Sequence, residues 1–182
     1  SVQSLMADDK GVLWIATNGG GLTRLSDVDL QTYSVLDGLN TNFVSALLQD
    51  REGNVWIGTE RGGLNMLRKT EISDLTTRDG LGNDYVRSVY EGRNGTVWAG
   101  TNGGGLSFLR NGKFTAISLK EVLSNDFVRP LFEDRSGDLW IGTWGGGIAF
   151  LRKGQVIQPA FLRNFPGRYI RAIVENRRGN IW

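Results

Sequence analysis

Apolar residues in this chain occur in short runs of strand length that are separated by polar turns. One stretch shows the whole pattern, with runs of β-forming residues at 86–91, 96–101, 106–110 and 113–117. The turns between them contain Asn94-Gly95, the Gly104 and Gly105 pair, and Asn111-Gly112, and such turns favour glycine because it reaches positive φ without steric cost. The pattern predicts four antiparallel strands joined by short hairpins.

The same pattern recurs with a fixed period of 42 residues. Tryptophan marks the period, at Trp14, Trp56, Trp98, Trp140 and Trp182, and no insertion interrupts it. The repeats are therefore 2–43, 44–85, 86–127 and 128–169, followed by a truncated fifth repeat at 170–182. Together, residues 1–182 make up a single partial domain of about four repeats plus two strands.

A twisted four-stranded sheet of this composition has two apolar faces, so each sheet needs a neighbour on either side. A radial stack of sheets satisfies that need. We therefore expect an all-β fold, a β-propeller of four-stranded antiparallel blades, of which this chain forms a partial arc. Helical repeats of similar length would show a 3.6-residue period, which is absent, and a β-helix would have shorter coils. The recurring tryptophans are expected to fill the gaps between blades, each indole N–H bonding to a backbone acceptor.

Composition narrows the chemistry that the chain can perform. Glycine supplies 26 residues and proline only 3, which indicates many tight turns rather than disorder. There is no histidine and no cysteine. This excludes imidazole bases, thiol nucleophiles, disulfides and the usual zinc ligand sets, and leaves carboxylates and hydroxyls. We expect no metal and no cofactor.

The charges predict neither a nucleic-acid partner nor a membrane contact for this segment. Lysine plus arginine number 21 and aspartate plus glutamate 19, and the two signs are interspersed. No stretch approaches 18 apolar residues. The chain does not begin with Met and opens inside a strand pattern, so we expect it to be part of a longer protein.

Arginine recurs at one position of the repeat. The second residue of the first strand is Gln3, Ser45, Arg87, Arg129 and Arg171 in successive repeats. Three adjacent blades would then direct guanidinium groups toward equivalent places near the axis, where they could bind a carboxylate, sulfate or phosphate. In the alternative, Arg87 and Arg129 form surface ion pairs, either with Asp84 and Asp126 or with Glu91 and Glu133, and have a structural role only.

Two further residues are candidates for ligand contact. Trp144 occupies a loop position that is Asn18, Glu60 or Asn102 in the other repeats, and an exposed aromatic ring there suits sugar or peptide contacts. Arg168 stands where the earlier linkers have an acidic residue or asparagine, so the region of Arg168 and Arg171 is expected to be electropositive.

The sequence supports neither a phosphate-binding loop nor a calcium-binding loop. The Asn-Gly-Gly-Gly stretches at 18–21 and 102–105 precede strands rather than helices, and they lack the lysine of a phosphate-binding loop. The acidic residues of the turns recur as turn formers, and their spacing matches no calcium loop.

The repeat motif resembles a known family. Residues 50–59 and 134–143, each followed by a glycine-rich hairpin, and the linkers 37–44 and 79–86 are similar to the two-component regulator propeller repeat. The departures are Gly92 in place of an acidic turn residue, Ala16 and Ala99 in the block after tryptophan, and Gly167-Arg168 before the last strand. The departure at 167–168 weakens the expectation that the linker 163–168 folds like the others.

This resemblance implies the extracytoplasmic sensing region of a bacterial membrane-bound signalling protein, a histidine kinase or a diguanylate cyclase. It implies seven blades per ring, a periplasmic position in an inner-membrane protein, and signalling domains further along the same chain. The leading hypothesis is a non-catalytic module that binds an unknown small molecule or oligosaccharide at its loop rim or channel mouth. The alternatives are a propeller lyase or hydrolase that uses carboxylates, and a purely structural propeller, for example one that forms a homodimer.

Overall fold

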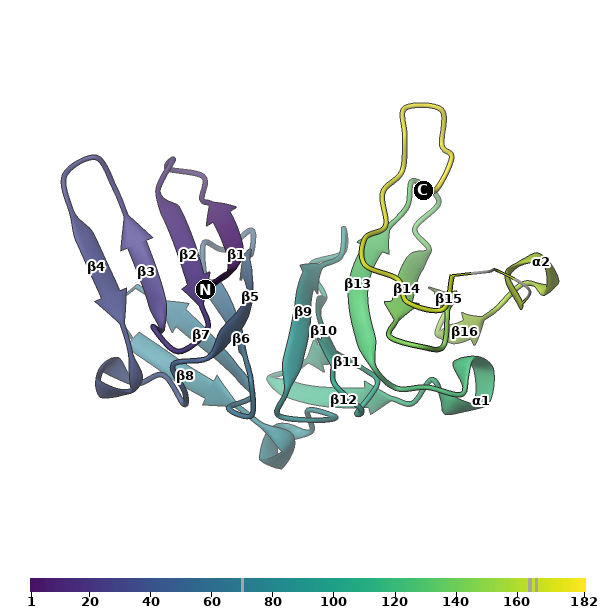
Figure 1. Cartoon of the computed structure of the whole chain (residues 1–182), viewed down its shortest axis with the longest axis horizontal. Helices are drawn as coiled ribbons and strands as arrows, with labels where there is room; N and C mark the ends of the chain where they lie inside the picture. The colour runs from purple at the N-terminus through teal and green to yellow at the C-terminus, as the bar shows by residue number, and fades with distance from the viewer. Residues whose placement is uncertain (70, 164, 166) are drawn as a thin grey trace.

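The computed structural model describes residues 1–69, 71–163, 165 and 167–182. Within these ranges the chain folds into four separate antiparallel sheets of four strands each, fanned out as an arc (Figure 1). Blade 1 comprises β1 (Val2–Ala7), β2 (Leu13–Thr17), β3 (Leu22–Leu25) and β4 (Leu30–Tyr33), and blade 2 comprises β5 (Val44–Gln49), β6 (Val55–Thr59), β7 (Leu64–Arg68) and β8 (Glu71–Leu75). Blade 3 comprises β9 (Val86–Glu91), β10 (Val97–Thr101), β11 (Leu106–Arg110) and β12 (Lys113–Ile117), and blade 4 comprises β13 (Val128–Glu133), β14 (Leu139–Thr143), β15 (Ile148–Arg152) and β16 (Gln155–Ile157).

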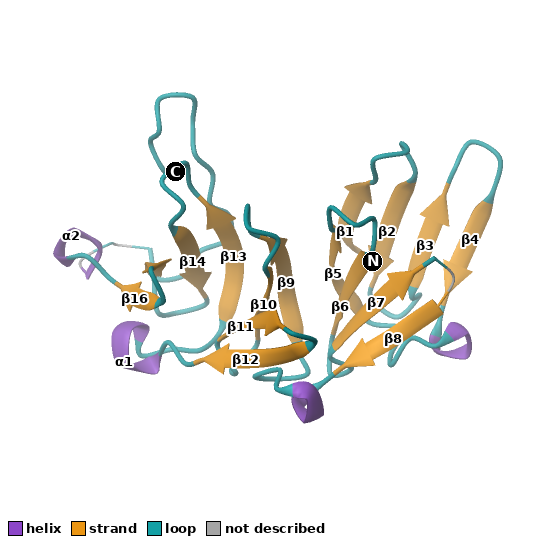
Figure 2. Cartoon of the chain, turned by 180° about the vertical axis from the view of Figure 1, so that it is seen from behind, coloured by secondary structure: helices purple, strands orange, loops and turns teal. Residues whose placement is uncertain are grey.

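Within each sheet the strands lie in chain order, and the first strands of neighbouring blades contact one another. β1, β5, β9 and β13 thus line the inner side of the arc, and β4, β8, β12 and β16 lie at its outside (Figure 2). The structure confirms the predicted all-β architecture, which is a partial β-propeller. The Asn111-Gly112 hairpin forms as expected, since both residues have positive φ, 52° and 75°.

Short helical turns occupy the linkers after each blade. They are the 3-10 turns η1 (Val35–Asp37) and η2 (Thr77–Asp79) and the helices α1 (Lys120–Leu123) and α2 (Ala160–Arg163). In the first three linkers a later side chain caps the turn, because Asn42, Asp84 and Asp126 each accept a hydrogen bond from its first amides. An arginine at position 168 cannot act as that acceptor. The linker 163–168 also includes residues 164 and 166, which lie outside the described residues.

The truncated fifth repeat forms a hairpin rather than two full strands. Val174 and Trp182 exchange backbone hydrogen bonds of 3.1 and 2.8 Å, and Glu175 bridges to Ile181. Ile170 joins blade 4 by donating to the carbonyl of Thr143. The expectation of two strands is therefore met only by isolated bridges in this segment. No described helix has the length and apolar character needed to cross a membrane.

Three hydrophobic clusters fill the three interfaces between blades. The first joins Trp14 and Leu22 of blade 1 to Val44 and Ile57 of blade 2, and the second joins Trp56 of blade 2 to the strands of blade 3. The third packs blade 3 against blade 4, with Trp98 at its edge. The apolar faces that each sheet presents are thus buried by the next sheet, and this burial is the main force that holds the arc together.

The tryptophans occupy equivalent registers, but the predicted backbone partner of the indole is wrong. The acceptor is an aspartate side chain from the first turn of the same blade. The Nε1 to Oδ2 distances are 3.0 Å for Trp14 to Asp8, 2.7 Å for Trp56 to Asp50 and 2.8 Å for Trp140 to Asp134. We call this pairing the aspartate–tryptophan clasp. The other carboxylate oxygen accepts two amides of the turn, so one side chain closes the turn and orients the ring.

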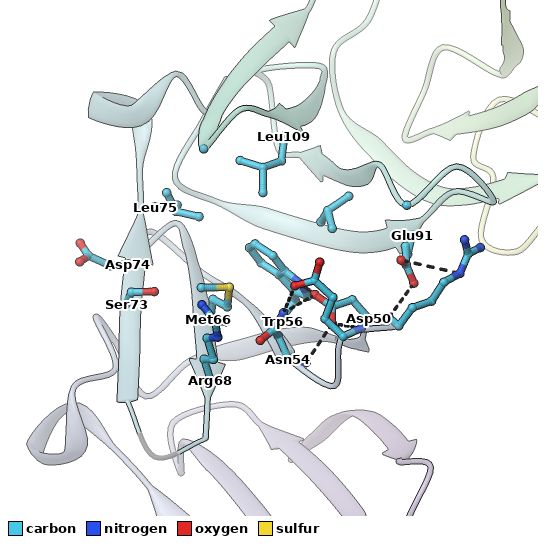
Figure 3. A pocket seen from close by; sticks show the side chains of 15 residues that line it. Asp50, Asn54, Trp56, Met66, Arg68, Ser73, Asp74, Leu75, Glu91 and Leu109 are labelled. Atoms are coloured by element: carbon cyan, nitrogen blue, oxygen red, sulfur yellow. Dashed lines mark hydrogen bonds and ion pairs between the residues drawn. The ribbon is translucent and has the colours of Figure 1, made fainter.

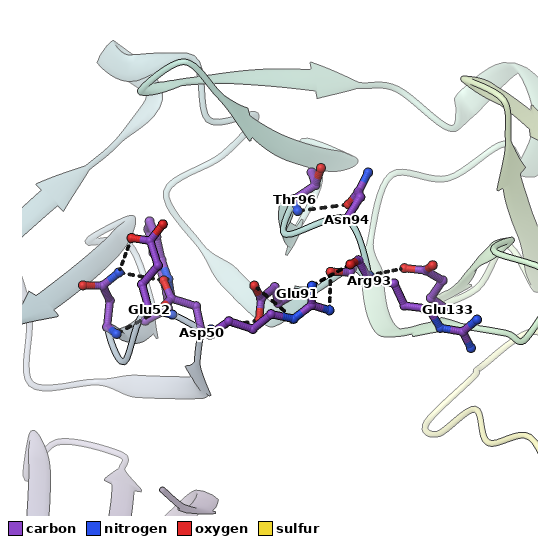
Figure 4. A network of polar contacts seen from close by, with 11 residues as sticks. Asp50, Glu52, Glu91, Arg93, Asn94, Thr96 and Glu133 are labelled. Carbon is purple, nitrogen blue, oxygen red and sulfur yellow. Dashed lines mark hydrogen bonds and ion pairs between the residues drawn. The ribbon is translucent and has the colours of Figure 1, made fainter. Parts of the chain in front are cut away.

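A polar ladder with the same 42-residue period joins the turns of neighbouring blades. Arg51, Arg93 and Arg135 donate from Nη1 to the carbonyl oxygens of residues 93, 135 and 177, at 2.5, 3.2 and 2.9 Å. In the opposite sense, Glu91, Glu133 and Glu175 accept the backbone amides of residues 51, 93 and 135, at 3.2, 2.8 and 3.2 Å. Figure 4 shows part of this ladder, from Asp50 through Glu91 and Arg93 to Glu133. The ladder therefore sets blades 2, 3 and 4 and the fifth repeat in register with one another.

Removing one clasp should destabilise the fold measurably. In Asp134→Ala, the Trp140 indole and the amides of Ser136 and Asp138 lose their acceptor in a buried place. The free energy of unfolding should fall by about 1–3 kcal/mol, measured by urea denaturation. Asp27→Ala is the matched control, because Asp27 is exposed. An equal loss in both variants would show that the clasp adds no stability.

The clasp should also make stability depend on pH in the acid range. Burial alone would raise the pKa of Asp134, but hydrogen bonds from the Trp140 indole and the turn amides outweigh it and lower this pKa. A lowered pKa in the folded state means that the stabilisation is present above the unfolded-state pKa, about 3.9, and is lost as the pH falls through the folded-state value. The stability difference between the wild type and Asp134→Ala should thus be constant from about pH 5 to 7 and shrink below about pH 4. A difference that grows on acidification, in urea titrations across this range, would contradict the assignment.

Candidate functional site

The arginine position of the repeat coincides with a β-bulge in the first strand of each blade. In blade 3, Val86 and Ser88 pair with Thr101 and Gly100, which leaves Arg87 between them without a partner. The same break in register occurs at residues 2–4, 44–46 and 128–131. A bulge bends the strand and redirects the extra side chain. Arg87 and Arg129 are therefore aimed by the backbone toward the inner rim of the arc.

Arg87 forms an ion pair across the blade interface. Its Nη1 lies 3.2 Å from Oε1 of Glu60 in blade 2, both side chains are about one quarter exposed, and the guanidinium lies 4.1 Å from the Tyr85 ring centre. Neither of the acidic partners suggested by the sequence, Asp84 or Glu91, pairs with Arg87. Asp84 accepts the amide and hydroxyl of Thr77, and Glu91 pairs with Arg51 in the polar ladder. Asp84 caps the linker turn and Glu91 belongs to the polar ladder, so neither carboxylate is available to Arg87.

Arg129 likewise has neither of the acidic partners proposed for it. Asp126 accepts the Leu119 amide and pairs with Lys120, and Glu133 accepts the Arg93 amide. In the described part of the chain, the Arg129 side chain makes no ion pair, and its buried Nε has no hydrogen-bond acceptor. A buried donor without a partner is costly and unusual in a folded protein.

Two arginines lie close to the Trp144 ring. The guanidinium carbons of Arg129 and Arg171 are 5.2 and 5.1 Å from its ring centre, within the range of cation–π attraction. Tyr169 meets Trp144 edge to face, with ring centres 4.9 Å apart. The indole is 38% exposed, as the expectation of an accessible ring required. We call Arg129, Trp144, Tyr169 and Arg171 the rim cluster.

The rim cluster is electrostatically unbalanced. Burial, and then the like charges of Arg87 and Arg171, lower the pKa of Arg129, while Tyr85 and Glu60 act in the opposite sense. Glu60 is already paired with Arg87. Three guanidinium groups thus share the influence of one carboxylate, which leaves the rim with excess positive charge.

Arg168 lies apart from this cluster. It lines a separate groove of about 320 Å³ with Gly145, Leu162 and Phe165. Its carbonyl accepts the amides of Gly145 and Gly147, as the equivalent linker carbonyls do in the earlier repeats. None of the residues that line this groove belongs to the rim cluster. The structure therefore divides the expected electropositive region into two places.

Grooves also run between the blades on the opposite rim. One of about 560 Å³ lies between blades 2 and 3, and Figure 3 shows the Trp56 ring among Met66, Leu75 and Leu109. Similar grooves of about 550 and 340 Å³ lie at the other two interfaces, beside Trp14 and Trp98. Their recurrence at every interface marks them as a consequence of blades that splay apart, and none includes a residue of the rim cluster.

Sequence reasoning missed Glu60, Tyr85 and Tyr169 as parts of the rim. A signal for two of them was present in the sequence, because Tyr85 and Tyr169 stand two residues before Arg87 and Arg171. Glu60 occupies the same repeat position as Trp144. Only the stacking of blades shows that this position contacts the arginine of the next repeat.

Comparison with known families agrees with this architecture. The family model described as "Two component regulator propeller" matches residues 1–19, 38–61, 80–103 and 122–145, half of the chain. The chain belongs to this family. Each matched segment ends one residue after the loop position of Asn18, Glu60, Asn102 or Trp144, so the family motif includes one part of the rim. No curated protein matches the chain.

Solved structures with the same arc include sensor proteins. The extracellular domain assigned to a hybrid two component system of B. thetaiotaomicron matches all of this chain with a TM-score of 0.80 and 28% identity, over 25% of its own length. A second such B. thetaiotaomicron domain matches 90% of the chain with a TM-score of 0.72 and 22% identity, over 24% of its own length. The chain thus spans about a quarter of these relatives.

Propeller enzymes share the fold as well. A streptogramin B lyase structure matches all of the chain with a TM-score of 0.78, over 61% of its own length, and virginiamycin B lyase from Staphylococcus aureus matches with a TM-score of 0.75. Their identities are 17% and 13%. At that level the likeness concerns the fold alone.

The ion pair between blades 2 and 3 should be detectable by a double-mutant cycle. Arg87→Ala and Glu60→Gln should show a coupling energy of about 0.5–1 kcal/mol in urea denaturation, since the pair is partly shielded from water. The matched control is the cycle of Arg87→Ala with Asp84→Asn, for which coupling near zero is expected. Stronger coupling to Asp84 than to Glu60 would contradict the observed pairing.

Proposed function

We propose that this chain is part of the extracytoplasmic sensing region of a membrane-bound bacterial signalling protein, and that it binds a ligand at its inner rim without converting it. The rim cluster carries the ligand part of the proposal. It offers an accessible aromatic pair beside two unpaired cations, whereas the blade interiors are packed. Membership of the two component regulator propeller family and the likeness to extracellular domains of two component systems support the sensing part.

Sensing would place the signal output elsewhere in the same protein. The B. thetaiotaomicron domains are about four times as long as this chain. We infer that further blades complete a ring around the inner strands, and that the complete protein is anchored in the inner membrane with its propeller on the periplasmic side. Ligand contact at the inner rim would then affect several blades at once, because Arg87, Arg129 and Arg171 come from consecutive repeats.

A lyase or hydrolase is the second candidate, favoured only by the propeller lyases of the same fold. One of those structures is a catalytically inactive histidine-to-alanine variant bound to quinupristin. This chain contains no histidine, so it could not use that residue type for the same task. An enzyme built on these blades would rely on carboxylates. Asp50 already binds the Trp56 indole, Asp84 caps a linker turn and Glu133 belongs to the polar ladder, and the rim carboxylate Glu60 is paired with Arg87.

A binding and turnover screen distinguishes these functions. The chain is titrated with neutral oligosaccharides, uronic acid oligosaccharides and streptogramin B while tryptophan fluorescence and thermal unfolding are followed, and each mixture is analysed by mass spectrometry after incubation. We expect saturable binding of one class and no product. Product formation would favour the enzyme, and the absence of binding across the panel would favour a purely structural propeller.

A further inference from the structure

The rim cluster contains two guanidinium groups beside one indole ring, and among the described residues neither has an anion to pair with. Arg129 reaches it from the bulge of β13, and Arg171 from the equivalent position of the fifth repeat. Both lie about 5 Å from the ring centre of Trp144. In the described residues neither side chain makes a hydrogen bond or an ion pair, although the neighbouring Arg87 has Glu60.

The way these arginines are held leaves their donors available. A guanidinium that packs against an aromatic ring uses its face for that contact, and its N–H donors lie in the plane of the group, directed outward. Two such groups beside one indole therefore present two forks of donors at a single site. Nε of Arg129 is buried and has no acceptor, so a partner that reached it would satisfy a donor that the protein itself leaves unpaired.

Repetition alone does not explain this arrangement. At the equivalent bulge of blade 2, the Ser45 hydroxyl has the carbonyls of Gly58 and Val86 as possible acceptors. At blade 3, Nη1 of Arg87 pairs with Glu60, although its buried Nε has no acceptor in the described residues either. The side chain at this position can thus find a partner inside the protein in two ways, by a hydrogen bond to a backbone carbonyl or by an ion pair. At blade 4 and the fifth repeat neither is used in the described residues, because the loop residues equivalent to Glu60 are Asn102 and Trp144, which carry no negative charge.

We propose that Arg129, Arg171 and Trp144 form a binding site for the oxyanion group of a small organic ligand, a carboxylate or a sulfate, whose ring or chain lies against Trp144 and Tyr169. This inference rests on the proposed ligand-binding function and specifies its chemistry. Oxyanions match the paired donors of arginine in geometry and charge. The exposed edge of the Trp144 and Tyr169 pair offers an apolar surface next to the charge.

Glucuronate and glucose are suitable probes, since they differ in a carboxylate on an otherwise similar ring, and sodium sulfate tests the anion alone. Binding is followed by the ¹H–¹⁵N signals of the arginine Nε groups and by tryptophan fluorescence. Glucuronate and sulfate should shift the Arg129 and Arg171 signals saturably, glucose should not, and added sodium chloride should weaken the response. Arg129→Ala and Arg171→Ala should each weaken binding at least about tenfold, the loss expected for one charged hydrogen-bonding group.

Arg110→Ala is the matched control, because it removes the same charge from an exposed strand end on the outer side of blade 3 and should leave binding unchanged. Arg171 is exposed, so its variant remains informative if Arg129→Ala does not fold. The inference is overturned if no oxyanion probe binds, if glucose binds as well as glucuronate, or if both rim variants keep wild-type affinity. Saturable binding of a neutral oligosaccharide, with no response to glucuronate or sulfate, would reject the oxyanion site and leave the ligand-binding function standing.

Discussion

The contact between the faces of neighbouring blades is the interaction on which the rest of this structure depends. A four-stranded sheet with apolar residues on both faces cannot be stable alone in water, so each blade acquires its core only from the next one. The three hydrophobic clusters lie at these interfaces. A constant period of 42 residues follows from this dependence, because an insertion in a strand would displace its side chains from the neighbouring face.

Polar groups then set the register that hydrophobic contact leaves free. The aspartate–tryptophan clasp orients the ring in blades 1, 2 and 4. The ladder of Arg51, Arg93 and Arg135 fixes the offset from blade 2 to the fifth repeat. In blade 3 the clasp is absent, since Gly92 stands where the aspartate would be. A Cβ added there would lie 2.9 Å from the Glu133 carboxylate and 3.3 Å from the Trp98 indole nitrogen. The carboxylate of the next blade thus approaches the position that the clasp would occupy.

The rim differs from the interfaces because the fold does not dictate which residues stand there. A bulge in each first strand directs one side chain inward, and the residue at that point is glutamine, serine or arginine. For the stability of the fold, the side chain at the bulge needs only to be solvated or to have a polar partner. The same backbone can therefore present different chemistry at successive blades, which is how a repeat protein can vary a binding surface without altering its core.

The sequence by itself determined the blades, their strands and their period, because alternating apolar residues, turn glycines and evenly spaced tryptophans are local signals. It also indicated that arginines recur at one inward position. Only the tertiary structure decided their partners. Arg87 meets Glu60, 27 residues away, and Arg129 and Arg171 meet at Trp144, because residues of neighbouring blades are brought together by stacking. The indole acceptors were mistaken for backbone groups for a related reason, since the position of the aspartate beside the ring depends on how the turn closes in space.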